Sequence, residues 1–297
     1  KDREEWRSRR REGIGASDAA AVIGFSPWKG AVRLYNEKIG LEVEDAEETE
    51  AMEWGRRLEP AVAAKYEEET GRALLHLGDY TILRSTKYSW MQTTLDRWIM
   101  TEDDRGPGIL QAKTAGFFKK QEWEGGEPPV YYQMQQTHEF IVAGVTWGSL
   151  AVLIGGQKFL WCDFALNTDF AEQLIERERE FFERVQRKEP PPFDGSADSA
   201  ALLKQLYPRH TEGKVVALPM EALQWDDELL RVKAEIKELS ARERAIKNLF
   251  AEAIGDAEIG LLSSGDGYSY KEVRKEPYTV KEQAYRELRR RAAKGSR

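Results

Sequence analysis

Apolar residues recur at helical spacing in several long segments of the chain. Trp54, Leu58, Val62 and Tyr66 follow a four-residue step, which predicts a helix over residues 52–70 with one buried face, ended by Gly71. The same periodicity predicts four further helical segments: residues 3–24 with a turn at 13–15, residues 131–143, residues 169–187, and residues 218–255 with near-heptad spacing.

Between the helices lie runs that are typical of strands. Strands are predicted at 80–83, 91–100 and 108–113, in a hairpin of 147–154 with 158–164 around two glycines, and in a short pair at 259–262 and 268–271. This order predicts a mixed α/β (α+β) fold whose sheet is flanked by helices. The proline run at 190–192 predicts a core over 1–190, a linker over 191–217 and a helical extension with a basic tail over 218–297.

Composition narrows the classes of function. With 297 residues, 41% of them hydrophobic, and no apolar run of membrane length, the chain is expected to be a soluble globular protein. Its net charge of −7 argues against a protein that coats nucleic acid, although an enzyme can confine basic residues to one groove. The single cysteine, Cys162, favours a reducing, cytoplasmic location. The three histidines are too scattered to indicate a metal cluster.

One strand carries a pattern suited to phosphodiester hydrolysis, which requires oxygen ligands for Mg²⁺ and a positive group near the attacking water. Alternation along residues 108–113 places Gln111 and Lys113 on one face and Ala112 on the other. Asp96, in the preceding predicted strand, is expected to converge with them, and Ala112 offers its backbone carbonyl as a further ligand.

The order of these residues resembles the PD-(D/E)xK nuclease signature, with Gln111 where an acidic residue is usual. Three other segments extend the resemblance to the lambda exonuclease and YqaJ-type viral recombinase family: REGIGASDAA at 11–20, WGRRLEP at 54–60 and YYQMQQ at 131–136. In that family the first segment holds the 5′-phosphate end of DNA, the second brings a glutamate to the metal, and the third places a glutamine near the catalytic lysine.

The resemblance spans residues 6–185 and implies a set of roles. Catalysis falls on Asp96, Gln111, Lys113, Glu59 and Gln133, metal binding on Asp96, Gln111, the Ala112 carbonyl and Glu59, and substrate binding on Arg11, Ser17 and Gln135. It further implies a restriction-endonuclease-like core and a homotrimer. The implied activity is Mg²⁺-dependent, with Mn²⁺ as a substitute, and digests linear double-stranded DNA from a 5′-phosphate end. The resulting 3′ overhangs would serve a single-strand annealing protein in a phage or prophage setting within a bacterial host.

The amide at position 111 leaves alternatives open. It is either an inactivating change or a natural variant that relies on Asp96 and Glu59, and Gln111→Glu is predicted to increase Mg²⁺-dependent cleavage if it is inactivating. A second hypothesis is a DNA-binding recombination scaffold with a degenerate centre. A third is an interaction module built on residues 221–250, which intact nuclease activity after deletion beyond residue 212 would contradict.

Overall fold

The computed structural model describes residues 3–41, 49–101, 104–123 and 127–274, together with Leu288 and Arg290. The chain forms two compact units, Lys1–Leu206 and Tyr207–Arg297. No helix in the described ranges has the length and apolar character needed to cross a membrane.

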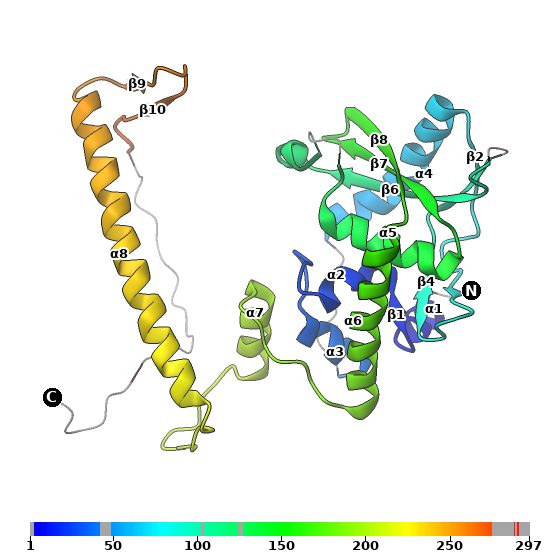
Figure 1. Ribbon diagram of the computed structural model, residues 1–297, viewed down its shortest axis with the longest axis horizontal. Helices are drawn as coiled ribbons and strands as arrows, with labels where there is room; N and C mark the ends of the chain where they lie inside the picture. Colours follow the sequence, from blue (N-terminus) through cyan, green and yellow to red (C-terminus); the bar gives the residue numbers. More distant parts are fainter. Residues whose placement is uncertain are drawn as a thin grey trace. The chain divides into compact units, whose positions relative to one another are not determined.

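The centre of the first unit is a five-stranded sheet in the order β2-β5-β6-β7-β8 (Figure 1). Neighbouring strands are antiparallel except β6 and β7, which are parallel and are joined through η2 (Phe117–Trp123) and α5 (Val130–Ala143), since parallel strands require a crossover connection. The strands are β2 (Ala73–Leu75), β5 (Arg97–Met100), β6 (Gly108–Ala115), β7 (Trp147–Ile154) and β8 (Lys158–Ala165).

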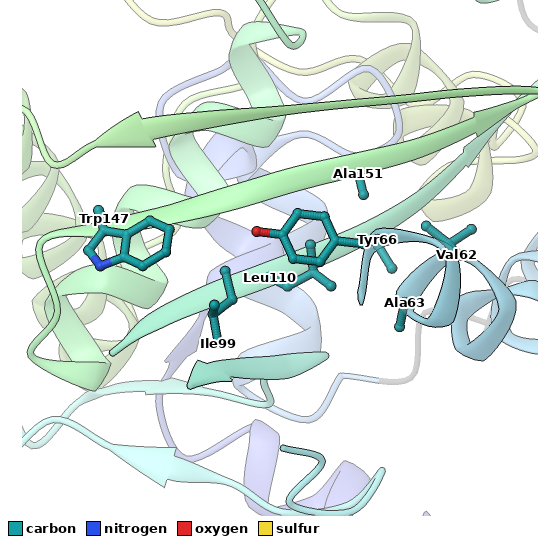
Figure 2. Close-up of a cluster of buried hydrophobic side chains, with 8 residues drawn as sticks. Val62, Ala63, Tyr66, Ile99, Leu110, Trp147 and Ala151 are labelled. Carbon is teal, nitrogen blue, oxygen red and sulfur yellow. The ribbon is translucent and has the colours of Figure 1, made fainter. Parts of the chain in front are cut away.

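The two faces of this sheet are covered by different helices. On one face α4 (Glu50–Thr70) packs its side chains against β6 and β7, as Figure 2 shows for Tyr66 with Leu110 and Ala151. On the other face Phe140 of α5 packs against Ile109 of β6. Successive β6 residues therefore point alternately to α4 and to α5, as the sequence predicts, and the predicted α4 and β7–β8 hairpin are confirmed. Trp54, expected to be buried, is 53% exposed at the start of α4.

A second, three-stranded sheet has the order β1-β4-β3 and changes two predictions. The strand predicted at 91–100 is in fact two strands in different sheets, β4 (Met91–Thr93) and β5, with Asp96 at the break. The strand expected at 80–83 is reduced to β3 (Leu83–Arg84). Asp96, which carries the predicted catalytic carboxylate, therefore lies in the connection between the two sheets.

The helix predicted over residues 3–24 is also interrupted. It is divided into α1 (Arg3–Arg10), β1 (Ile14–Gly15), η1 (Ala16–Asp18) and α2 (Ala19–Val22). Ile14 pairs with Met91 of β4, and a Cβ at Gly13 would lie 2.5 Å from the carbonyl oxygen of Trp90, so only glycine allows this approach. Ser17, within η1, accepts a hydrogen bond from Arg10.

The remaining helices of the first unit are α3 (Ala31–Lys38), α6 (Thr168–Arg187) and α7 (Ala197–Leu206). The apolar face of α6 packs with α2 and α3 through a cluster that includes Phe181, Leu34 and Ala21. In α7, Asp198 accepts hydrogen bonds from the backbone of Gly30 at 2.7 Å and from Arg33 at 2.5 Å. Part of the segment predicted as a linker is therefore bound to the core.

The second unit contains α8 (Ala222–Ile254), β9 (Ile259–Leu261) and β10 (Gly267–Ser269), which match the long helix and short strand pair predicted from the sequence. Within α8, which the structure describes in full, no residue is buried. The predicted basic tail, 286–297, lies outside the described residues except for Leu288 and Arg290, and Arg290 forms an ion pair with Asp226 at 2.8 Å.

Candidate active site

A cavity of about 650 Å³ in the first unit is lined by four of the nine predicted site residues. Glu59, Asp96, Gln135 and Ser17 all line it. Four arginines share its walls with the acidic side chains, which gives a pocket with both cation-binding and anion-binding groups; they are Arg3, Arg10, Arg56 and Arg97.

Asp96 is held in place by the backbone of β6. Its Oδ2 accepts the N–H of Ala112 at 2.9 Å. Strand β5 pairs with β6 only at residues 108–110, so at Ala112 the carboxylate takes the position that a neighbouring strand would otherwise fill. The predicted convergence of Asp96 with residues 111–113 is thus present, and it depends on the break between β4 and β5.

The face of β6 opposite α4 carries Gln111 and Lys113, and both contact α5. Lys113 Nζ donates to Gln135 Oε1 at 3.3 Å, and Gln111 Nε2 donates to Glu139 Oε1 at 2.6 Å. Gln135 Nε2 also donates to Glu139 Oε1, at 3.2 Å. Gln111 and Lys113 of β6 are therefore linked by hydrogen bonds to Gln135 and Glu139 of α5, and the four form one hydrogen-bonded group. The two α5 residues lie on one face of the helix because residues four apart are neighbours.

Glu139 is the member of this group that sequence reasoning missed. Its side chain lines the cavity although the residue is only 1% exposed. Burial, followed by the nearby charge of Asp96, raises the pKa of Glu139 to about 8, against the opposing effects of Lys113, Gln135 and Gln111. The sequence did offer one indication of this role: Glu139 lies four residues after Gln135, which places both side chains on the same face of a helix. Strongly shifted carboxyls of this kind are concentrated at functional sites.

Glu59 projects from α4 to the same cavity. Its Oε1 accepts a hydrogen bond from Arg97 Nη1 at 2.8 Å, and Arg97 also donates to the backbone carbonyl of Asp96. Burial and the charge of Asp96 raise the pKa of Glu59, while Arg97 opposes the shift. Arg97 therefore connects the two acidic residues and compensates part of their repulsion.

The donor atoms at the site fit a hard divalent cation. In the part of the chain that the structure describes, no three His, Cys, Asp or Glu side chains are gathered as metal ligands. Two buried acceptor oxygens, Gln111 Oε1 and Glu139 Oε2, nevertheless lack any hydrogen-bond partner among the described residues. Unsatisfied buried acceptors are costly, and oxygen ligands are those that Mg²⁺ prefers.

The N-terminal segment contributes Arg10 to the same cavity. Its Nη2 donates to Ser17 Oγ at 2.6 Å, and its guanidinium lies over the ring of Trp6 at 4.6 Å. Arg11, the arginine assigned by resemblance, is exposed and does not line the cavity. Helix α1 ends at Arg10, and the sequence alone does not reveal which of the two arginines lines the cavity.

The side chains of two further predicted residues point away from the hydrogen-bonded group, as expected for Ala112 but not for Gln133. Gln133 Nε2 donates to the carbonyl of Pro128 at 2.7 Å, because residues two apart on a helix point to opposite sides and only Gln135 faces Lys113. The side chain of Ala112 packs in the core beneath α4. Of the α5 glutamines, the structure therefore brings Gln135, rather than Gln133, to the site.

Comparison with known proteins agrees with this architecture. The model of the YqaJ-like viral recombinase domain matches residues 5–146, a range that includes the site residues described above except Arg3. A Bacillus subtilis (strain 168) protein described as uncharacterized protein YqaJ is 30% identical over 265 residues, which cover 88% of this chain and 81% of that protein.

Solved structures share the fold at low sequence identity. The alkaline exonuclease LHK-Exo from Laribacter hongkongensis superimposes with a TM-score of 0.51 at 16% identity, over 68% of this chain and 97% of that chain. Its complex with dAMP gives a TM-score of 0.50 at 17% identity, with the same coverage. The fold predicted from the sequence is thus confirmed as that of the alkaline exonucleases. By its similarity to YqaJ over most of both chains, this chain belongs to the YqaJ-like viral recombinase family.

Proposed function

We propose that this chain is a Mg²⁺-dependent exonuclease that digests one strand of linear double-stranded DNA in the 5′-to-3′ direction and leaves 3′ overhangs. One observation carries the proposal: Asp96 binds the strand between Gln111 and Lys113, which both contact α5, and it lines a cavity that four arginines also line. Family membership and the alkaline exonuclease fold support the same activity.

The site residues divide the chemistry between them. Asp96, Glu59, the Gln111 amide and the Ala112 carbonyl would hold the cation, which when bound supplies a more acidic water and a polarised scissile phosphate. Lys113, held by Gln135, is placed to orient the attacking water and to offset charge that develops on the phosphate. Manganese, which accepts the same oxygen ligands, is expected to substitute for magnesium.

The cavity also suggests how the strand end is chosen. Arg10 and Ser17 form a hydrogen-bonding pair suited to a terminal phosphate, because a guanidinium can donate two parallel hydrogen bonds to phosphate oxygens. An enzyme that requires a 5′-phosphate must regenerate one at every step. Water attack should therefore break the bond between phosphorus and the 3′ oxygen of the terminal nucleotide, which departs as a 5′-mononucleotide.

The test is a nuclease assay on linear duplex with one labelled 5′-phosphoryl end, in Mg²⁺ and in EDTA. We expect Mg²⁺-dependent release of 5′-mononucleotides and 3′ single-stranded product, and a fall of about 100-fold or more in rate for Lys113→Met. Lys65→Met, on the exposed side of α4, is the matched control and should retain the rate. Duplex binding without cleavage in Mg²⁺, and without cleavage when Mn²⁺ replaces it, would instead support the degenerate scaffold hypothesis.

Assembly and partners follow from the same proposal. A homotrimer surrounding the duplex would keep the enzyme on its substrate, and the 3′ overhang would be the substrate of a single-strand annealing protein. Sedimentation of the purified chain tests the trimer, and pull-down of an annealing protein encoded beside it tests the partner. A strictly monomeric, fully active enzyme would exclude the trimer while leaving the cleavage chemistry intact.

A further inference from the structure

The amide at position 111 removes a negative charge from the strand, and α5 places another carboxylate directly against that amide. Glu139 Oε1 accepts the Gln111 Nε2 hydrogen bond at 2.6 Å. The two side chains come from β6 and from α5, and each residue is 1% exposed. Position 111 on the strand lacks a carboxylate, but the carboxylate of Glu139 is hydrogen-bonded directly to the amide that stands there.

Geometry distinguishes the roles of the two side chains. Glu139 lines the cavity together with Asp96 and Glu59, whereas Gln111 does not line it. Glu139 Oε1 is occupied by Gln111 and Gln135, while Oε2 is buried without a hydrogen-bond partner among the described residues. A buried carboxylate oxygen without a hydrogen-bond partner, near the charge of Asp96, requires a positive ligand or a proton.

The pairing also explains why residue 111 is an amide. A glutamate at that position would bring two carboxylates to hydrogen-bond distance in a buried site, where like charges repel strongly. Glutamine instead donates to Glu139 and fixes the direction of its carboxylate. The neutral residue on the strand and the charged residue on the helix are therefore complementary.

We propose that Glu139 is a ligand of the divalent cation and supplies from α5 the negative charge that position 111 lacks. Gln111 then has a positioning role for Glu139 through its Nε2, beside the amide oxygen that it offers to the cation, and the site keeps the charge required for a divalent cation. This inference deepens the nuclease function proposed above and rests on the same cavity. It replaces the reading of Gln111 as a mark of inactivation.

The proposal is tested by Mn²⁺ binding to the full-length protein, measured by titration calorimetry and by electron paramagnetic resonance, without DNA. Glu139→Gln should weaken Mn²⁺ binding by about 10-fold or more. The exchange variant Gln111→Glu/Glu139→Gln, which keeps one carboxylate and one amide, should bind Mn²⁺ within about 3-fold of the unmodified protein. Gln111→Glu alone should lower the melting temperature in EDTA at pH 8, and adding Glu139→Gln should restore it.

Glu178→Gln is the matched control. Glu178 is as buried as Glu139, but its Oε1 lies 2.8 Å from His138 Nδ1 and it does not line the cavity. It should leave Mn²⁺ affinity unchanged, and melting curves establish that each variant is folded. Wild-type affinity in Glu139→Gln, or no recovery in the folded exchange variant, would overturn the assignment. Failure of the nuclease function is separately visible: the protein would then bind Mn²⁺ through Glu139 and yet leave DNA intact.

Discussion

Arg10 and Arg11 are neighbours in sequence but have different surroundings. Arg10 lines the cavity and binds Ser17, while Arg11 is exposed away from it. Arg10→Ala should therefore reduce the preference for 5′-phosphoryl over 5′-hydroxyl duplex ends by about 10-fold or more, the effect of one lost charge-assisted hydrogen bond. Competition between the two kinds of end measures this ratio.

Arg11→Ala is the natural control for that experiment because it removes the same charge one residue further along. Its end preference should match that of the unmodified enzyme. The opposite pattern, with the preference lost only in Arg11→Ala, would assign the phosphate to Arg11, as the family resemblance implies.

Asp18 is a buried charge whose contribution to stability depends on pH. It is 1% exposed and lies 3.1 Å from Lys29 Nζ and 2.7 Å from Lys38 Nζ. Burial alone would raise the pKa of Asp18, but Lys29, Lys38 and Arg10 together hold it well below the ordinary value of 3.8. A depressed folded-state pKa stabilises the protein above the unfolded value, and this stabilisation is lost as pH falls through the folded value.

Asp18→Asn should accordingly lower the free energy of unfolding near pH 7 by about 3–5 kcal/mol, because the buried Lys38 ammonium loses its carboxylate partner and Lys29 keeps only Glu37. Denaturant melts across pH give the measurement, and the difference from the unmodified protein should shrink progressively below pH ~4. Asp169→Asn, at an exposed position in the first turn of α6, should change stability by less than about 0.5 kcal/mol. A pH-independent difference for Asp18→Asn would contradict the electrostatic explanation.

The approach of α5 to the sheet depends on a glycine in β7. A Cβ at Gly148 would meet the carbonyl oxygen of Ile109 and would lie 2.6 Å from Gln136 Nε2 and 2.7 Å from the Phe140 ring. Gly148→Ala should therefore push α5 from β6 and destabilise the fold by about 1–3 kcal/mol. Because α5 carries Gln135 and Glu139, metal affinity should fall as well. Melting temperature and Mn²⁺ titration report the two effects.

Gly116→Ala, just after β6, is the control for Gly148→Ala, since nothing lies within 4 Å of the Cβ position at Gly116. Stability should change by less than about 0.5 kcal/mol there. If Gly148→Ala is equally silent, the close packing of α5 on the sheet is not required for the fold.

Elements defined by local periodicity were predictable, and those defined by distant pairing were not. The apolar step of α4 and the glycine turn between β7 and β8 are encoded within each segment. The break between β4 and β5 instead depends on the pairing of Met91 with Ile14, and the helix predicted from residue 3 ends for the same reason. The role of Glu139 was not predictable from the sequence, because packing of α5 against the sheet determines which of its side chains face β6.

Across the chain as a whole, the chemistry and the long helix belong to different units. Every residue assigned to the cavity lies in the first unit, which ends at Leu206. The second unit exposes apolar side chains along α8, among them Leu223, Ile236 and Leu239, which is typical of a surface that binds another protein. Function is therefore expected to be separable at the unit boundary.

A chain ending at residue 212 should fold and retain cleavage of short linear duplex within about 3-fold of the full-length enzyme, a difference of less than about 1 kcal/mol in activation free energy. The five-stranded sheet, α4, α5 and the bound α7 all remain in that fragment. Cooperative melting establishes that it is folded, and initial rates at saturating Mg²⁺ give the comparison. Loss of cleavage in a cooperatively folded fragment would mean that α8 and its strand pair act in DNA binding or in subunit assembly. That result would support the interaction-module hypothesis, whereas intact cleavage would contradict it.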